Sequence, residues 1–276
     1  MNGTELIVRH SFAPNRLRYC GRSDLSDLVP RFISVSSTEL QNRLQTELLS
    51  FRGLFSYLSL IARENGLNPF DEKVGEAYWI GNELLSNVSH SSFRQLFAEK
   101  FSQDDFLGKE LALDLAKKIP MDCVCHHSFH VFFTHFMTQA VPVTIRNLDL
   151  CRISWGKVME ADGKNPHQLR VEFEPLEFDA QSKKVFFGKK QEKLIEKPFE
   201  DSVLEGDWVS FHWNVYCMKL SEKQKNDLEF FTKKNLNAIN LQSRIHFSAG
   251  NSALASEKSL SEDWLSKEDV EAWKKL

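Results

Sequence analysis

The stretch EGDWVSFHWNVYCMKL (residues 205–220) alternates apolar and more polar side chains, and this pattern decides how we expect the C-terminal half to fold. A period of two is typical of a β-strand whose two faces meet different surroundings. We therefore predict one continuous strand from Trp208 to Tyr216. On this strand His212 lies opposite the apolar face that contains Phe211, so we expect its imidazole at the surface of the sheet.

Shorter segments upstream have the same period, and several short strands joined by turns favour a small barrel. We expect strands over residues 151–160, 169–173 and 184–187. After the barrel, Ser221 begins the pattern Ser-Glu-Lys-Gln, a capping box that should start a helix reaching to about Asn237. The prediction is a small OB-like β-barrel with a C-terminal helix.

The N-terminal part has a helical pattern instead. From Thr38 to Ile61, apolar residues recur at steps of three and four, which predicts one long helix that ends at Gly66. A second helix is expected from Asp71 to Val88, with shorter helices following it. The fold class is therefore α+β, with a helical domain before the barrel.

A chain of 276 residues is long enough for two compact units, since domains usually contain roughly 100–200 residues. Four segments are predicted in chain order: a mainly helical domain (1–120), a His/Cys-rich junction (121–149), the barrel with its helix (150–240), and a linker with a terminal amphipathic helix (241–276).

Composition excludes several classes of protein. The net charge is −3 and no basic patch dominates, so nucleic acid is not an expected partner. No apolar run reaches the roughly 18 residues that a membrane span needs, and the N-terminus lacks a signal-peptide core. We expect a cytoplasmic protein. In that compartment, the odd number of cysteines, 5, favours metal or thiol chemistry over a disulfide framework.

Two separated segments, CRISWGKVMEADG (151–163) and residues 205–231, resemble the HypC/HupF family of hydrogenase-maturation chaperones. In both the family and this chain, a cysteine is followed by Gly, a basic residue and Val, and a late Gly-Asp leads into a strand with a histidine. The resemblance covers about a third of the chain. The matching residues are Cys151, Gly156, Lys157, Val158, Gly206, Asp207, Trp208, His212, Lys219 and Leu220.

The resemblance implies a metallocentre-assembly protein rather than a classical enzyme. Those chaperones carry an iron fragment during assembly of nickel–iron hydrogenases, hold it through the cysteine thiolate, and pass it on through protein contacts. It therefore implies that Cys151 is an iron ligand, that His212 lies near it, and that the partner is a maturation protein or a hydrogenase-like client. Thiolate is a soft ligand that suits such iron.

A second candidate site is the junction cluster, which consists of Cys123, Cys125, His126, His127 and His130. Whether this segment is helical or extended, His126 and His130 share a face. The ligand types suit zinc or iron, which leaves a metal-dependent enzyme between the helical domain and the barrel as an alternative function. Two further alternatives are that these histidines only bond the backbone, and that the protein is a metal-free interaction module.

Weaker candidates lie near the N-terminus. The stretch that contains Asn15, Arg16 and Cys20 is polar and precedes a turn. It is expected either to line a cleft or to serve as a capping loop.

Overall fold

The computed structural model describes residues 1–21, 23–101, 108–134, 144–160 and 165–241. They all belong to one compact unit, Met1–Ser243, while a second unit comprises Arg244–Leu276. The predicted terminal helix and nearly all of its linker fall on residues 242–276, outside the described residues.

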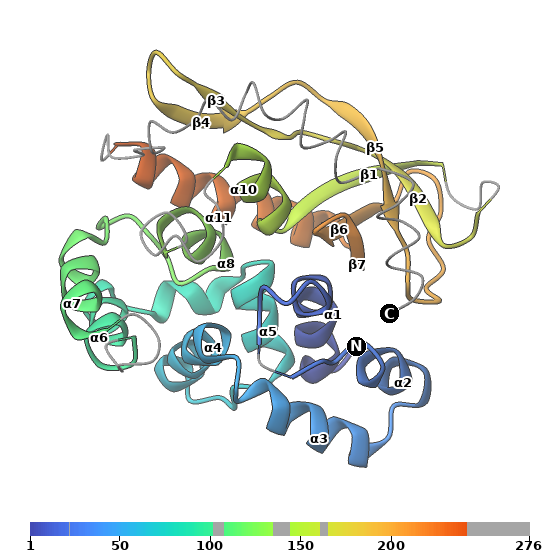
Figure 1. The fold of residues 1–276 in the computed structure, drawn as a ribbon, viewed down its shortest axis with the longest axis horizontal. Helices are drawn as coiled ribbons and strands as arrows, with labels where there is room; N and C mark the ends of the chain where they lie inside the picture. Colours follow the sequence, from blue (N-terminus) through green and yellow to red (C-terminus); the bar gives the residue numbers. More distant parts are fainter. Residues whose placement is uncertain (22, 102–107, 135–143, 161–164, 242–276) are drawn as a thin grey trace, which may run out of the picture. The chain divides into compact units, whose positions relative to one another are not determined.

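The N-terminal part is helical, as predicted (Figure 1). Short polar side chains begin several of its helices: Asn2, Ser37 and Asp71 each accept a hydrogen bond from a backbone N–H of the first turn. The helices are α1 (Gly3–Arg16), α2 (Leu28–Val35), α3 (Thr38–Leu48), α4 (Arg52–Asn65), α5 (Glu72–Trp79), the 3-10 helix η1 (Glu83–Asn87), α6 (His90–Glu99) and α7 (Lys109–Lys118).

Both long helices predicted here are interrupted. The first divides into α3 and α4 around Ser50, whose hydroxyl bonds the carbonyl of Glu47 at 2.7 Å and so competes with the helical pattern. The second ends at Trp79, because Gly81 adopts a φ of +99°. A Cβ on Gly81 would lie 2.1 Å from the Phe231 ring, so this glycine also permits the close approach of a later helix.

The C-terminal part is a mixed sheet, which confirms the α+β class. β1 pairs antiparallel with β2 and β6, β2 with β5, and β6 with β7. The order β1-β2-β5-β7-β6 returns to β1, but β5 and β7 are joined by the single parallel pair Glu196↔Val215. A single residue pair does not close a barrel between β5 and β7. The expected barrel is therefore corrected to a curled five-stranded sheet. A separate hairpin contains β3 and β4. The strands are β1 (Ser154–Glu160), β2 (Gln168–Phe173), β3 (Leu176–Asp179), β4 (Lys184–Phe187), β5 (Gln191–Glu196), β6 (Trp208–His212) and β7 (Val215–Leu220).

The single strand predicted from Trp208 to Tyr216 is wrong, because the chain reverses within it. Trp213 and Asn214 have φ values of 51° and 59°, which are typical of the tight turns that join antiparallel strands. The reversal places His212 at the end of β6 and the start of β7 directly beyond it.

Helices connect the two parts. α11 (Glu222–Leu241) packs against α8 (His127–Phe129), β1, β6 and β7, and α1 also packs on β6 and β7 (Figure 1). The predicted capping box of α11 is confirmed, since Ser221 and Gln224 exchange backbone-to-side-chain bonds of 3.0 and 3.2 Å. Among the described residues, no helix is long and apolar enough to cross a membrane.

Candidate metal centre

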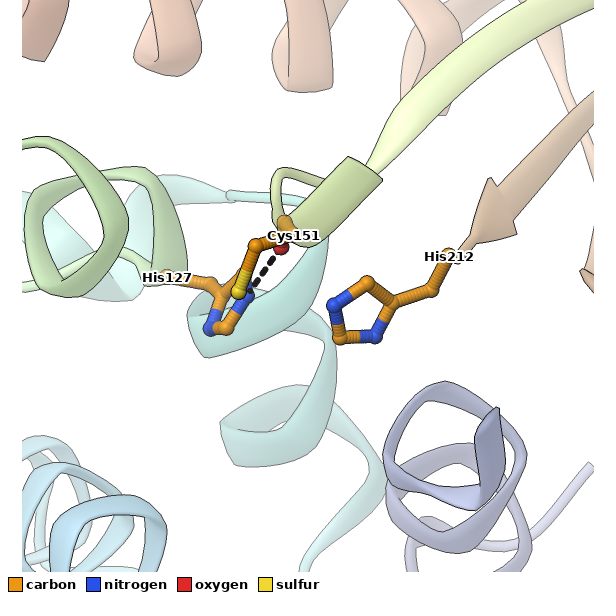
Figure 2. A group of neighbouring side chains, drawn as sticks. All are labelled: His127, Cys151 and His212. Carbon is orange, nitrogen blue, oxygen red and sulfur yellow. Dashed lines mark hydrogen bonds between the residues drawn. The ribbon is translucent and has the colours of Figure 1, made fainter. Parts of the chain in front are cut away.

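Three side chains from separate segments converge where the helical part meets the sheet (Figure 2). They are His127 at the start of α8, Cys151 at the end of α10 (Ile145–Cys151), and His212 at the end of β6. One ligand atom from each lies within 4.8 Å of the others. We call these three residues the metal group.

Cys151 is positioned by a helix end, not by the strand predicted for residues 151–160. Thr144 caps α10 by accepting a bond from the Asn147 N–H at 3.1 Å, and the helix ends at Cys151 before β1 begins. The backbone N–H of Trp213 donates to the carbonyl of Leu150 at 2.9 Å. This bond ties the end of α10 to the turn that follows His212, so two members of the metal group are held together by backbone.

His212 is buried, with 1% of its surface exposed, which corrects the expectation that it lies at the sheet surface. The face opposite Phe211 is covered by α1. The Nδ1–H of His212 donates to the carbonyl of His10 at 2.6 Å, because a carbonyl can only accept. Such a bond orients the ring and makes Nε2 the nitrogen whose lone pair can coordinate a metal.

His127 is held at both ring nitrogens. Nε2–H donates to the backbone carbonyl of Cys151 at 3.0 Å, as the dashed line in Figure 2 shows, and Nδ1 lies 3.2 Å from the hydroxyl of Tyr78. A hydroxyl can donate or accept. Tyr78 can therefore stabilise either neutral tautomer of His127, including the one whose Nε2 would bind a metal in place of the proton.

Aromatic rings surround the two imidazoles. The Trp79 ring centroid lies 4.5 Å from that of His127 and 5.9 Å from that of His212. Burial, followed by the nearby charges of His212 and His130, lowers the pKa of His127 well below its usual value. His127 is therefore neutral at physiological pH, as a metal ligand must be.

Cys151 is half-buried and its thiol is protonated in the metal-free protein. Burial, and then the nearby Cys20, raises the pKa of Cys151 to about 12, while a hydrogen bond from the Trp213 side chain acts in the opposite direction. A bound cation would reverse this balance, because it stabilises the thiolate directly.

The spacing of the metal group fits a small cation. Around a tetrahedral ion, Zn–N bonds of about 2.0 Å and Zn–S bonds of about 2.3 Å place ligand atoms roughly 3.3–3.8 Å apart. The limit of 4.8 Å in the structure exceeds this by about an ångström. Small side-chain rotations would close that difference, so one thiolate and two imidazoles can hold a metal here. The identity of the metal is not fixed by this geometry.

The junction cluster does not converge. His126 caps the start of α8, where its Nδ1 accepts from the Ser128 N–H at 3.2 Å. His130 is half-buried, with Nδ1 3.4 Å from the Tyr57 hydroxyl. Burial, and then the charge of Asp122, raises the pKa of Cys123 to about 12, and Cys125 is buried as well. Of the five residues predicted, only His127 joins the metal group.

Of the three N-terminal candidates, Asn15 holds the loop that follows α1, which fits one of the two roles expected. Asn15 is buried and donates from Nδ2 to the carbonyls of Cys20 and Ser23, both at 2.8 Å. Arg16 forms an ion pair with Glu196 on β5. Cys20 contributes, after burial, to the raised pKa of Cys151.

Sequence reasoning missed the residues that orient the metal group. Tyr78 belongs to the apolar stripe of a predicted helix. The one feature that could have indicated its role is a hydroxyl group at a core position. His10 contributes a backbone carbonyl, and a backbone contact of this kind leaves no trace in the identity of a residue.

A family model described as "Family of unknown function (DUF6390)" matches residues 1–246. The chain belongs to this family. DUF6390 therefore spans the helical part, the curled sheet and all three members of the metal group. No curated protein and no solved structure matches the chain. The description of the family assigns no activity to the site.

Proposed function

We propose that this protein holds iron in the metal group and passes it to a client during metallocentre assembly. One observation carries the proposal. Cys151 and His212, the two residues implied by the resemblance to HypC/HupF chaperones, lie in one group with His127, with ligand atoms within 4.8 Å. They are far apart in sequence, and the resemblance was drawn from short motifs without reference to where the fold places them.

The chemistry of the group suits transport of a metal. One thiolate with two neutral imidazoles favours ferrous iron or zinc over magnesium or calcium, which prefer oxygen ligands. Three protein ligands leave a coordination position for another ligand of the iron or for the acceptor. Cys151 is half-buried whereas both histidines are buried, so in this proposal iron enters and leaves on the side of the residue Cys151.

The curled sheet supplies the docking element in this proposal. β1, β2, β5, β6 and β7 with α11 correspond to the segments that resemble the chaperones, and an OB-like topology for them is part of the same hypothesis. The partner is accordingly a maturation protein or a hydrogenase-like client.

Iron content after anaerobic purification tests the binding step. We expect about one iron per chain when the protein is produced with added iron. Cys151→Ala and His212→Ala should each lower iron affinity by more than the roughly 10–100-fold that loss of an outer-shell partner costs. Cys123→Ala removes a buried thiol outside the group and serves as the control. Iron content unaffected by Cys151→Ala would exclude the proposed site.

A metal-dependent enzyme is the second candidate, because three protein ligands with an open position also characterise catalytic zinc sites. Incubation of the iron-57-loaded protein with a metal-free hydrogenase large subunit separates the two. Iron-57 recovered on the large subunit after chromatography supports a carrier. Retention of the metal on this protein under the same conditions favours the enzyme.

A further inference from the structure

The metal group contains three ligands, yet zinc and ferrous iron bound by sulfur and nitrogen commonly take four. The loop after α1 carries a second thiol, Cys20, and contacts the turn that follows His212 through the rings of Tyr19 and Trp213. We propose that Cys20 is the fourth ligand and that the resting protein holds a soft divalent cation in a Cys2His2 site made of Cys20, His127, Cys151 and His212. This inference rests on the proposed metal binding and specifies its coordination.

The backbone around Cys20 is fixed. The N–H of Cys20 donates to the carbonyl of Pro14 at 3.3 Å, and its carbonyl accepts from Asn15 Nδ2 at 2.8 Å. The next residue, Gly21, has a φ of +81°, and a Cβ there would lie 2.2 Å from the Phe51 ring. Glycine thus lets the loop press onto the helical core, and Cys20 occupies a defined place.

The same loop is attached to the metal group through Tyr19. The ring centroids of Tyr19 and Trp213 lie 4.7 Å apart. Trp213 directly follows His212, and its backbone N–H is bonded to the residue that precedes Cys151. The contact therefore brings Cys20 to the point where two ligand-bearing segments already meet.

The electrostatics agree with this placement. Cys20 contributes to the raised pKa of Cys151, second only to burial. Burial, followed by the charges of several neighbours that include both Cys20 and Cys151, also raises the pKa of Tyr78, whose hydroxyl faces His127. The placement itself rests on the contact between the Tyr19 and Trp213 rings. A cation bound there would stabilise both thiolates.

Cys20 would be the most easily exchanged ligand. It lies outside the set of atoms within 4.8 Å of one another, so it must move onto the ion, while the other three ligands are held by element ends. In a carrier, this is the ligand that an acceptor would displace first.

Cobalt(II) is a suitable probe, because thiolate-to-cobalt charge-transfer absorption increases with the number of bound thiolates. In an anaerobic titration, we expect Cys20→Ser to bind one cobalt with roughly half the charge-transfer intensity of the wild type, since one of two thiolates is lost. Cys123→Ser, the matched control, should keep the full intensity. Full intensity in Cys20→Ser would overturn the inference while leaving the metal group intact.

Measurements on the wild type and on Cys151→Ala separate the inference about Cys20 from the proposed metal site. X-ray absorption of the cobalt-loaded wild type should show two sulfur neighbours at about 2.3 Å, and one sulfur would overturn the role of Cys20 alone. A wild-type protein that takes up no cobalt, or an unchanged charge-transfer band in Cys151→Ala, would overturn the proposed metal site and this inference with it.

Discussion

The junction cluster and the metal group both combine histidine with cysteine, and they share only His127. In the junction cluster, neighbours in sequence point in different directions, because a short helix start needs its side chains for capping: Nδ1 of His126 accepts from the Ser128 N–H. In the metal group, residues distant in sequence point toward one another, because each stands at the end of a different element. Density of ligands along a chain is therefore weaker evidence for a site than convergence of element ends.

The largest expected effect concerns three buried, neutral imidazoles: His127, which both regions contain, His126 of the junction cluster, and His10, whose backbone carbonyl orients His212. Burial lowers the pKa of His10 and of His126 to about 3, and that of His127 lies well below 6.5. Because the unfolded chain takes up protons near pH 6.5 and the folded chain does not, stability is complete above that pH and falls as the pH decreases toward 3. Between pH 7 and 5 each imidazole should remove about 2 kcal/mol, or about 6 kcal/mol in total.

Urea unfolding of the metal-free protein at both pH values measures this loss. His126→Gln should remove about a third of the pH dependence although His126 lies outside the metal group. If the free energy of unfolding were equal at pH 7 and pH 5, these imidazoles would have to take up protons in the folded protein as they do in the unfolded chain, and His127 would be excluded as a neutral ligand.

The next largest effect distinguishes the metal group from the junction cluster. It concerns metal affinity after substitution of Tyr78, which orients His127. Tyr78→Phe removes the hydroxyl that faces His127 Nδ1, so the tautomer that exposes Nε2 to a metal loses its partner. We expect metal affinity to fall by roughly 10–100-fold, as for other outer-shell partners. Competition with a chelator of known affinity measures the change.

Asn235→Ala provides the matched control on the junction side. It removes bonds to the N–H and the carbonyl of Val124 and to the Ser128 hydroxyl. The free energy of unfolding should fall by about 1–3 kcal/mol, because buried polar groups lose their partner, with metal affinity unchanged. The opposite pattern, in which Asn235→Ala weakens the metal and Tyr78→Phe does not, would transfer the site to the junction cluster.

Local physics explains which parts of the fold could be predicted. The capping box of Ser221 and Gln224 involves residues three apart, and it formed as expected. The break between α3 and α4 contains neither Gly nor Pro, the residues that usually indicate the end of a helix, so the sequence did not predict it. The turn after His212 is built from Trp213 and Asn214 at positive φ, where an Asn-Gly pair would have been the usual signal.

The site could be predicted only in part: the resemblance implies that His212 lies near Cys151, but nothing in the sequence joins His127 to them. Cys151 and His212 were identified through a family resemblance and His127 through the density of ligands around it. Nothing in the sequence indicates that α10, α8 and β6 end at one point, because that depends on how α1 and α11 pack between the helices and the sheet. The same packing buried His212, which alternation along the strand had placed at the surface.

The smallest expected effect is also the sharpest test of the comparison. His130 lies three residues from His127, and their ring centroids are 6.3 Å apart, so a cluster acting as a unit would use both. His130 instead faces the Tyr57 hydroxyl at 3.4 Å, a long bond whose loss in His130→Ala should cost about 1 kcal/mol of stability or less. Iron or cobalt affinity should stay within about twofold of the wild type, whereas His127→Ala should lose the metal, since only ligands and their direct partners carry large effects. Equal losses in the two variants would mean that the junction binds metal through adjacent turns after all, and that convergence of element ends is not what builds this site.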